Sequence, residues 1–442
     1  MELIGIIGIF LSIFILIYGS MKSVPLFPLC IIAIVIVSVS NGINVWTAFS
    51  DYFLTGAHSA VTSFLLILGA ATIYSELMDK SGSTLSISNW CLSTFGRKNV
   101  VVVLLVMALV LSLAGMNGMM IAVALYTIIC SLLKEANLPR HLAAAIVLFA
   151  GNFGDGFYPL SCHINNVLPG QFLGTPLTAG AGFGLMMGVL CLVFAGIYLV
   201  IELRLIKKRG EVWTDPEGGL SVYNSESGSS ELPTALVAFL PMLILTGMIL
   251  ALSNLGYSSS YTAVVSMLCA SLACALLNLR SLRSNNVNFF VLIHKSLERT
   301  VTTIAPFIFL LGYGQVVSET YGYRSIVELI IGLDLSPYWK AAFSTAAISG
   351  VMASAAGGIR LTLQSLSDYF LNCGANVGYI ARIITMSSTA LDTLPHCGAI
   401  FVLFSIYGLN HKTAYKHCFW MTVVNTSICT VIGILFLTVL GL

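Results

Sequence analysis

Two polar clusters interrupt apolar stretches of the chain, and each contains an aspartate shortly before a proline. Asp392 lies three residues before Pro395, and Asp155 lies four residues before Pro159. A proline inside a helix removes a backbone donor and frees a carbonyl of the preceding turn, so both helices are expected to unwind there. Unwound helix ends offer N–H groups to an anion and carbonyl oxygens to a cation or a proton carrier.

Ionisable groups within apolar spans are costly to bury and are functional candidates for that reason. Asp392 and Asp155 are therefore our candidates for the group that carries a proton. The alternative for Asp392 is that it caps a half-helix, and the alternative for Asp155 is a place nearer the outer surface. Asn152, Thr393 and His396 lie in the same two clusters and are candidate substrate ligands.

Two longer apolar runs, about 240 residues apart, are interrupted by glycine and small polar residues. The first covers 100–133 and is broken at 114–118. The second covers 338–371 and is broken at Ser349-Gly350 and again at 353–358. Each run is longer than the ~20 residues that cross a bilayer core as a helix. We predict two re-entrant hairpins with Gly-rich tips, because irregular backbone at that depth survives only when it is buried or lines a cavity.

Paired broken segments of this kind indicate the binding site of a transporter. The residues at the two tips that could hold a carboxylate are Asn117, Gly118, Ser354, Gly357 and Gly358. Arg360 follows the second tip and could bind a carboxylate through two parallel hydrogen bonds. Equally, Arg360 could reach the outer surface or pair with Asp368.

The composition indicates a membrane protein. Hydrophobic residues make up 57% of the chain and charged residues 9%, whereas soluble domains contain about 25% charged residues. The eleven cysteines show no CxxC or Cys/His spacing, so we expect neither a metal site nor a cofactor. Motifs such as HExxH and GxSxG are absent, which argues against a membrane enzyme, and we expect no nucleic-acid partner.

The apolar segments form two halves with the same pattern of three spans, a hairpin, an interrupted span and a final span. The expected segments of the first half are Leu3–Tyr18, Leu26–Ile43, Ala60–Met78, 100–133, 142–167 and Ala179–Ile201. Those of the second half are Pro233–Leu252, Tyr261–Leu279, Val301–Ser318, 338–371, Ile380–Phe404 and Trp420–Leu440. Five crossings per half is an odd number, so the second half is expected to be inverted. We predict an all-α polytopic membrane protein, an inverted repeat of two five-span units. Its parts are residues 1–203, a cytoplasmic linker at 204–232, and residues 233–442.

The distribution of lysine and arginine gives an orientation through the positive-inside rule. If the linker is cytoplasmic, all ten cations of the first half fall inside: Lys22, Lys80, Arg97, Lys98, Lys134, Arg140, Arg204, Lys207, Lys208 and Arg209. The second half places Arg280, Arg283, Lys295, Arg299, Lys412 and Lys416 inside, and Arg324, Lys340 and Arg382 outside. Both termini are then expected outside, with the first hairpin entering from the cytoplasm and the second from outside.

Several motifs resemble those of a known family. Leu391–Ala399 (LDTLPHCGA) followed by Gly408–Tyr415 (GLNHKTAY) resembles the signature of the gluconate:proton symporter family of carboxylate permeases. Further similar segments are Ala353–Gly358, Met78–Gly82, Lys134–Pro139 and Ile164–Pro169, and the resemblance covers about residues 60–435. The chain departs from the family pattern at Met116-Asn117, at 159–162 and at Cys397.

The resemblance implies a scaffold domain, a mobile transport domain, commonly a homodimer, and a place in the bacterial plasma (inner) membrane. It also implies proton-coupled uptake of a small hydroxy- or keto-carboxylate, such as gluconate or a related sugar acid. Because burial favours the neutral form of a carboxyl group, Asp392 and Asp155 would carry the coupling proton. The alternatives are a cation/proton antiporter that uses the same carboxylates and, from other classes, a membrane enzyme or a channel.

Overall fold

The computed structural model describes residues 2–22, 24–113, 118–159, 163–176, 178–215, 232–255, 257, 259–285 and 287–441. Helices form nearly all of this part of the chain, and the described residues contain no β-strand. The expected all-α class is confirmed. Asn117, one of the candidate ligands, lies outside the described residues.

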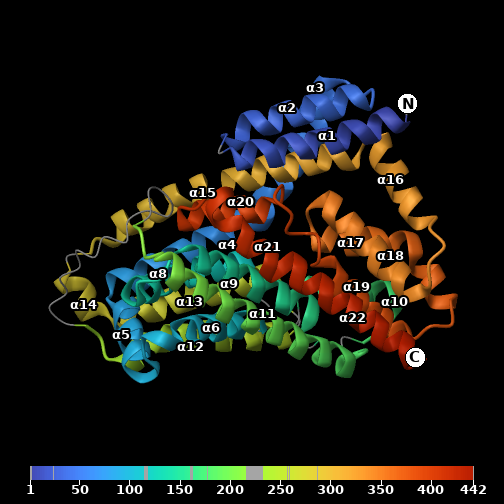
Figure 1. Ribbon diagram of the computed structural model, residues 1–442. Coiled ribbons are helices and arrows are strands. Elements are labelled where there is room, and N and C mark those ends of the chain that lie inside the picture. The colour runs from blue at the N-terminus through green and yellow to red at the C-terminus, as the bar shows by residue number, and fades with distance from the viewer. Residues whose placement is uncertain are drawn as a thin grey trace.

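The first half of the chain begins with a small group of helices and continues into a larger bundle (Figure 1). Its helices are α1 (Glu2–Met21), α2 (Leu26–Ser40), α3 (Val45–Thr47), α4 (Leu54–Lys80), α5 (Ser83–Phe95), α6 (Val100–Leu113), α7 (Gly118–Ala124), α8 (Tyr126–Ala136), α9 (His141–Asn152), α10 (Ile164–Leu173) and α11 (Ala181–Arg209). A π-helical turn at Phe153–Phe157 extends α9.

The second half of the chain is likewise helical. Its helices are α12 (Ala235–Asn254), α13 (Ser259–Leu277), α14 (Leu279–Ser284), α15 (Phe289–Ser318), α16 (Tyr321–Ile331), α17 (Pro337–Met352), α18 (Ala355–Asn372), α19 (Val377–Ser388), α20 (Gly398–Tyr407), α21 (Lys416–Phe419) and α22 (Asn425–Val439). Each expected apolar segment of both halves coincides with one or more of these helices. α5 and α16, which are short and less apolar than the spans, were not predicted from the sequence, nor were the shorter helices α3, α14 and α21.

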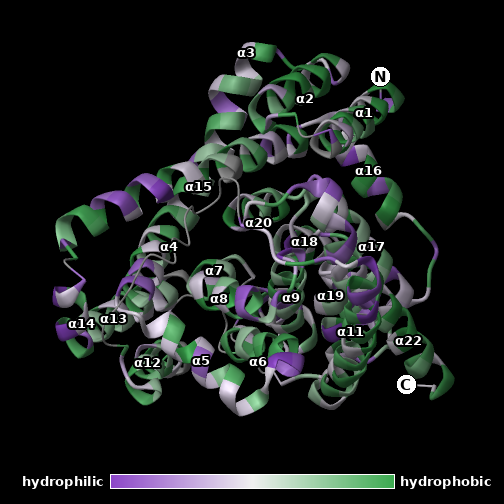
Figure 2. Cartoon of the chain, turned by 60° about the vertical axis from the view of Figure 1, so that its left-hand side comes forward, coloured by the Kyte–Doolittle hydropathy of each residue, from purple (hydrophilic) through white to green (hydrophobic). Residues whose placement is uncertain are grey.

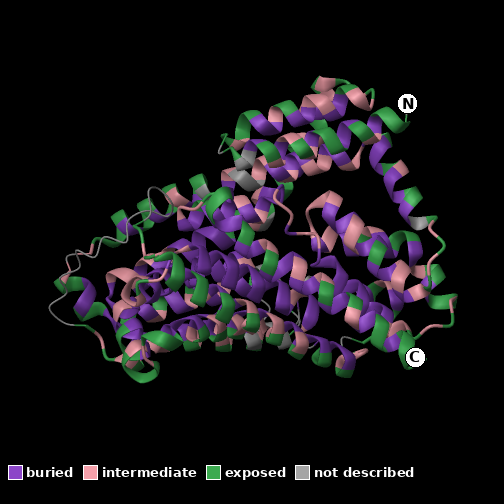
Figure 3. Cartoon of the chain, viewed as in Figure 1, coloured by how far each residue is buried: buried purple, intermediate pink, exposed green. Residues whose placement is uncertain are grey.

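Four helical segments of the described chain are long and apolar enough to cross a membrane: Glu2–Gly19, Val45–Lys80, Ala181–Arg209 and His411–Val439. Two bent pairs of helices pass the same criterion together. Figure 2 shows apolar residues along most of α1, α2, α12 and α22, and large apolar side chains such as Ile7, Leu236 and Val439 are exposed there. Figure 3 shows that the buried residues concentrate in the central helices, and α9 is buried along its whole length.

Helices at corresponding positions of the two halves make corresponding contacts. α1 packs on α2 as α12 packs on α13, and α2 contacts α15 as α13 contacts α4. Likewise α1 contacts α16, and α12 contacts α5. Neither half packs as a separate body, because one hydrophobic core joins residues such as Ile9 and Ala33 to Val316 and Ile330.

The second hairpin is made of α17 and α18, which pack along each other. Its tip is the pair Ala353 and Ser354. Ala353 has a left-handed backbone (φ 50°), and the Ser354 Oγ accepts a hydrogen bond from the Gly357 N–H. The expected break at Ser349-Gly350 is wrong, because α17 continues through both residues. A Cβ on Gly350 would lie 3.0 Å from the Leu391 Cβ, so this glycine serves close packing.

The run expected to form the first hairpin contains α6 before 114–117 and α7 and α8 after it. Its return arm is bent by 67° between α7 and α8, whereas the sequence led us to expect one half-length helix. Before the hairpin, α5 meets the segment that contains α6 at 105°. Gly96 lies at that corner with a positive φ of 75°, a backbone conformation that favours glycine.

The structure corrects the expected place of Arg382. The charge distribution put this residue in an outside loop, but it lies within α19 and is 2% exposed. Its Nη1 donates a hydrogen bond to the Asn166 Oδ1 at 3.0 Å. Gly180 leaves room for the long side chain, since a Cβ there would lie 2.8 Å from the Arg382 Cγ.

The contact between α4 and α15 is the most extensive between any two helices, and it depends on Gly56. A Cβ on Gly56 would lie 2.3 Å from the Leu311 carbonyl oxygen, so a Gly56→Ala substitution would force the two helices apart. We expect a loss of about 1–3 kcal/mol, measured as a lower melting temperature of the purified protein.

Gly69, on the same helix, is the matched control. A Cβ at Gly69 would meet only the Thr300 Cγ2, at 3.9 Å, and alanine is the better helix former by about 1 kcal/mol. Gly69→Ala should therefore be neutral or stabilising. Equal melting temperatures for the two variants would contradict the close crossing of α4 and α15.

Candidate functional site

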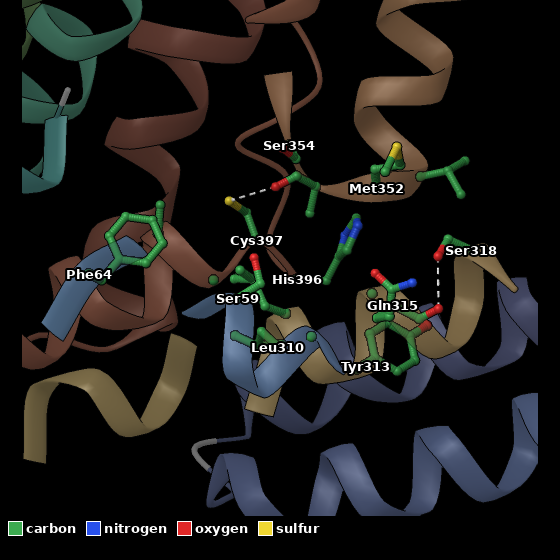
Figure 4. Close-up of a pocket in the computed structure, with 17 residues that line it drawn as sticks. Ser59, Phe64, Leu310, Tyr313, Gln315, Ser318, Met352, Ser354, His396 and Cys397 are labelled. Carbon is green, nitrogen blue, oxygen red and sulfur yellow. Dashed lines mark hydrogen bonds between the residues drawn. The ribbon is translucent and has the colours of Figure 1, made fainter. Parts of the chain in front are cut away.

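A cavity of about 330 Å³ lies where the second hairpin, the segment between α19 and α20, and the helices α4 and α15 meet (Figure 4). One wall comes from the hairpin tip and from residues 396–399. The other wall comes from α4 and α15 and includes Ser59, Tyr313, Gln315 and Ser318. Segments from both halves of the chain thus enclose a single space.

Two helices begin at this cavity. α18 starts directly after Ser354 and α20 directly after Cys397, and both of these N-cap residues line the space. The first N–H groups of a helix lack intrahelical partners, and its N-terminus carries a partial positive charge. The lining residues include no Lys, Arg, Asp or Glu. Helix N-termini are in general suited to anions, and here they meet walls without a formal charge.

His396 connects the cavity to the hairpin. Its Nε2 lies 3.0 Å from the Gly350 carbonyl oxygen, so Nε2 carries the hydrogen and Nδ1 is left as an acceptor. Nδ1 is buried and has no hydrogen-bond partner within the described part of the chain. Nearby, the Cys397 thiol donates to the Ala353 carbonyl oxygen at 3.5 Å. These two bonds hold the hairpin tip against the segment between α19 and α20.

The opposite wall has hydrogen-bonding side chains on α15. The Gln315 Nε2 donates to the Glu319 Oε1 at 3.0 Å, and the Ser318 Oγ donates to the Gln315 carbonyl oxygen at 2.8 Å. Both contacts are local, and they orient Gln315 beside the cavity (Figure 4). Ser59, Gln315 and Ser318 were not predicted from the sequence as site residues. For Gln315 and Ser318 the sequence does contain an indication, because two polar residues three apart in an apolar span lie on one face of the helix.

The two aspartates lie outside the cavity lining, where the interrupted spans cross. Asn152 donates a hydrogen bond to the Thr389 carbonyl oxygen at 3.2 Å and also contacts the Asp392 carboxylate. The Thr385 hydroxyl donates to the Gly156 carbonyl oxygen at 3.1 Å. The Asp392 Oδ1 is buried and has no hydrogen-bond partner in the part of the chain that the structure describes.

Asp155 is paired with a histidine. The His163 Nε2 lies 3.1 Å from the Asp155 Oδ1, and both side chains are at least 85% buried. The His163 Nδ1 accepts a hydrogen bond from the Asn165 N–H at 3.3 Å, so the ring hydrogen is on Nε2, the nitrogen nearer the carboxylate. Asp155 is also close enough to Asp392 for their charges to interact. The structure thus brings together the two aspartates that the sequence singled out.

Several other candidate ligands do not line the cavity and instead pack against neighbouring helices or lie on the surface. The Thr393 hydroxyl is 2.8 Å from the Thr422 hydroxyl. Gly118 begins α7 and faces α9, since a Cβ there would lie 3.4 Å from the Val147 carbonyl oxygen. Arg360 is exposed on α18 and is not among the residues that line the cavity. Of the candidate ligands, Ser354 and His396 lie in the wall itself.

Comparison with known proteins supports a transporter. No protein-family model matches the chain. The chain is 26% identical over 460 residues to the uncharacterized transporter YxjC of Bacillus subtilis (strain 168), an alignment that covers 94% of this chain and 95% of that protein. The name of that protein says that it is a transporter but names no substrate. The similarity is therefore to a transporter and not to an enzyme. Together with the apolar helices it identifies a helical membrane protein.

The two tip glycines differ in what surrounds them. A Cβ on Gly358 would lie 2.8 Å from the Ser349 Cα, which is backbone, whereas one on Gly357 would meet the flexible end of Met352 at 2.9 Å. We expect Gly358→Ala to lower the melting temperature, by a loss of about 1–3 kcal/mol. Gly357→Ala should be tolerated, because the Met352 side chain can rotate. A thermal melt of both variants tests this, and a greater loss at Gly357 would show that the hairpin arms pack differently.

Proposed function

We propose that the protein is a secondary active transporter that takes up a small organic carboxylate with protons by alternating access. The observation that carries the proposal is the pair of helix N-termini, at Ser354 and Cys397, that open onto one cavity with uncharged walls. A carboxylate there receives N–H groups from two helices, each of which favours negative charge.

The remaining polar groups of the cavity suit a hydroxy- or keto-carboxylate. The buried His396 Nδ1 has no partner among the described residues and, in this proposal, a turn of the ring brings it to a substrate hydroxyl, while Gln315, Ser59 and Ser318 offer hydrogen-bonding groups on the opposite wall. Substrate oxygens beyond the carboxylate would thus find partners on both sides. Gluconate and related sugar acids fit this chemistry, and the resemblance in the motifs around His396 favours the same substrate class.

A cation/proton antiporter is the second candidate. The observation in its favour is the pair of partly buried aspartates outside the cavity lining, each of which has a buried carboxylate oxygen with no hydrogen-bond partner among the described residues. Carboxylate oxygens are the groups that bind hard cations. In the proposed transporter the same two aspartates accept the coupling proton.

The proposal includes the inverted repeat of residues 1–203 and 233–442, joined by the cytoplasmic linker 204–232. The contacts that α1, α2, α4 and α5 make in the first half match those that α12, α13, α15 and α16 make in the second. This match supports the repeat. In this scheme α4 and α15 belong to a scaffold, and the hairpins and interrupted spans form a mobile domain, so the cavity lies at the boundary between them. A homodimer in the bacterial plasma membrane completes the scheme.

The proposed orientation places both termini outside. Ser336, directly before α17, and Lys98, in the 3-10 turn Arg97–Asn99 that precedes α6, are exposed. In a cysteine-free background we expect a cysteine at Ser336 to react with an impermeant maleimide added outside the cell, and one at Lys98 to react only after permeabilisation. Labelling of both from the same side would contradict the inverted repeat.

Transport itself is tested by counterflow uptake of labelled carboxylates into proteoliposomes. Ser354→Asp tests whether this cavity is the anion site, because aspartate keeps the N-cap of α18 but adds a negative charge beside the bound anion. We expect this variant to keep the wild-type melting temperature and to lose carboxylate uptake. Ser336→Asp, at the exposed N-cap of α17, is the matched control and should transport normally. Carboxylate uptake that survives Ser354→Asp would exclude this cavity as the anion site.

Proton coupling is expected to depend on Asp392. In Asp392→Asn the side chain can no longer change charge, so a pH gradient should drive no accumulation of substrate. Exchange of internal for external substrate should persist, because exchange needs no net release of a proton. Asp368→Asn, at an exposed position of α18, is the control. Accumulation by Asp392→Asn with the wild-type pH dependence would remove Asp392 from the coupling mechanism.

A further inference from the structure

A second group of ionisable side chains lies outside the cavity described above. It contains His141 at the start of α9, Glu202 on α11 and His417 on α21. One ligand atom from each of the three side chains lies within 4.8 Å of the other two, and all three residues are buried. The proposed transport mechanism uses none of these residues.

We propose that His141, Glu202 and His417 form a binding site for a divalent transition-metal ion of the zinc type. Two imidazoles and one carboxylate are a common set of protein ligands for Zn²⁺, and imidazole nitrogen favours zinc and its neighbours over Mg²⁺ or Ca²⁺. A bound ion would fasten α9, α11 and α21 to one another. This site does not depend on the proposed function.

His141 supplies an observation that points to a ligand. Its side chain is 10% exposed, and its Nε2 has no hydrogen-bond partner among the described residues. The Glu211 Oε2 lies 4.0 Å from this nitrogen, which is beyond hydrogen-bonding distance. A buried polar atom without a partner is costly, and an ion between His141 and Glu202 would satisfy it.

The present side-chain positions require one ring to turn. The His141 and His417 rings are stacked, with centroids 4.0 Å apart and an angle of 11° between their planes. Two nitrogen ligands of a tetrahedral zinc lie about 3.3 Å apart with the ion in both ring planes. A histidine ring rotates easily about its second torsion angle. Tyr198, whose hydroxyl is 2.8 Å from the His417 Nδ1, would then release that nitrogen to the ion.

Arg209 is the competing cation in this cluster. Its guanidinium pairs with Glu202 through Nη2 and with the Glu211 Oε1 through Nε at 3.1 Å. Because Arg209 holds two carboxylates, it can release Glu202 to a metal ion and keep Glu211. Its side chain is 39% exposed at the end of α11, so water can replace the hydrogen bonds that it loses on releasing Glu202. In the metal-free state the Arg209 guanidinium is thus the cation that pairs with Glu202.

An ion can reach the cluster from solvent. A second cavity, of about 1020 Å³, is lined by His141, His417, Arg209 and Glu211 among others. It also contains Lys412 and Lys416, which disfavour cations, so we expect an affinity below that of structural zinc sites. The cavity adjoins residues 211–215 at the start of the linker, which in the proposed orientation faces the cytoplasm.

The test is zinc binding to tag-free protein in detergent, measured by equilibrium dialysis with metal analysis. We expect one zinc per chain at micromolar free zinc and a higher melting temperature when zinc is bound. His141→Gln and His417→Gln should each weaken binding roughly tenfold or more. His294→Gln removes a histidine that is 74% exposed and should have no effect.

Arg209→Gln distinguishes a metal site from a purely structural network. If Arg209 competes for Glu202, its removal should tighten zinc binding several-fold, although it lowers the stability of the metal-free protein. Cobalt added to the wild-type protein should give the visible absorption of a tetrahedral site, and this measurement needs no variant. Wild-type protein that binds less than one zinc per chain, or binding unchanged in both His141→Gln and His417→Gln, would overturn the proposal.

Discussion

Backbone groups released where the two helices unwind have to find hydrogen-bond partners inside the protein, and the rest of the structure depends on how they do so. A free carbonyl in an apolar interior costs several kcal/mol. Side chains from neighbouring elements satisfy these groups. The His411 Nε2 is 3.0 Å from the Pro395 carbonyl oxygen, and the Tyr415 hydroxyl donates to the Thr393 carbonyl oxygen at 3.2 Å. In the first interrupted span, Asn166 donates to the Tyr158 carbonyl oxygen at 3.1 Å.

These bonds also join the two unwound segments to each other and to the hairpin. Asn152 and Thr385 each bond to a carbonyl of the opposite interrupted span, and His396 holds the hairpin at Gly350. On the other wall of the cavity, α4 and α15 have their own link between the Thr72 and Thr300 hydroxyls, 3.0 Å apart. These hydrogen bonds join elements within one wall, and between the walls α15 packs on α20.

The sequence predicted the parts of this arrangement that follow from local chemistry. Pro395 and Pro159 mark interruptions because proline acts on its own helix, and the second hairpin breaks within the expected segment. The partners of each residue could not be predicted, because they come from distant parts of the chain. Thr393 looked like a ligand donor, but its hydroxyl meets Thr422. Gly358 does permit close approach, as expected of glycine, although what approaches is Ser349.

The separation between the cavity and the aspartates has a consequence for coupling in the proposed transporter. An anion in the cavity and an ionised Asp392 would repel each other without touching. Two like charges about 8 Å apart at an effective dielectric constant of about 20 repel by about 2 kcal/mol, which is roughly thirtyfold in an equilibrium constant. Protonation of Asp392 removes this repulsion, so proton and anion bind more tightly together than apart. Because such coupling is reciprocal, the anion raises the proton affinity of Asp392 by the same factor, and neither has to contact the other.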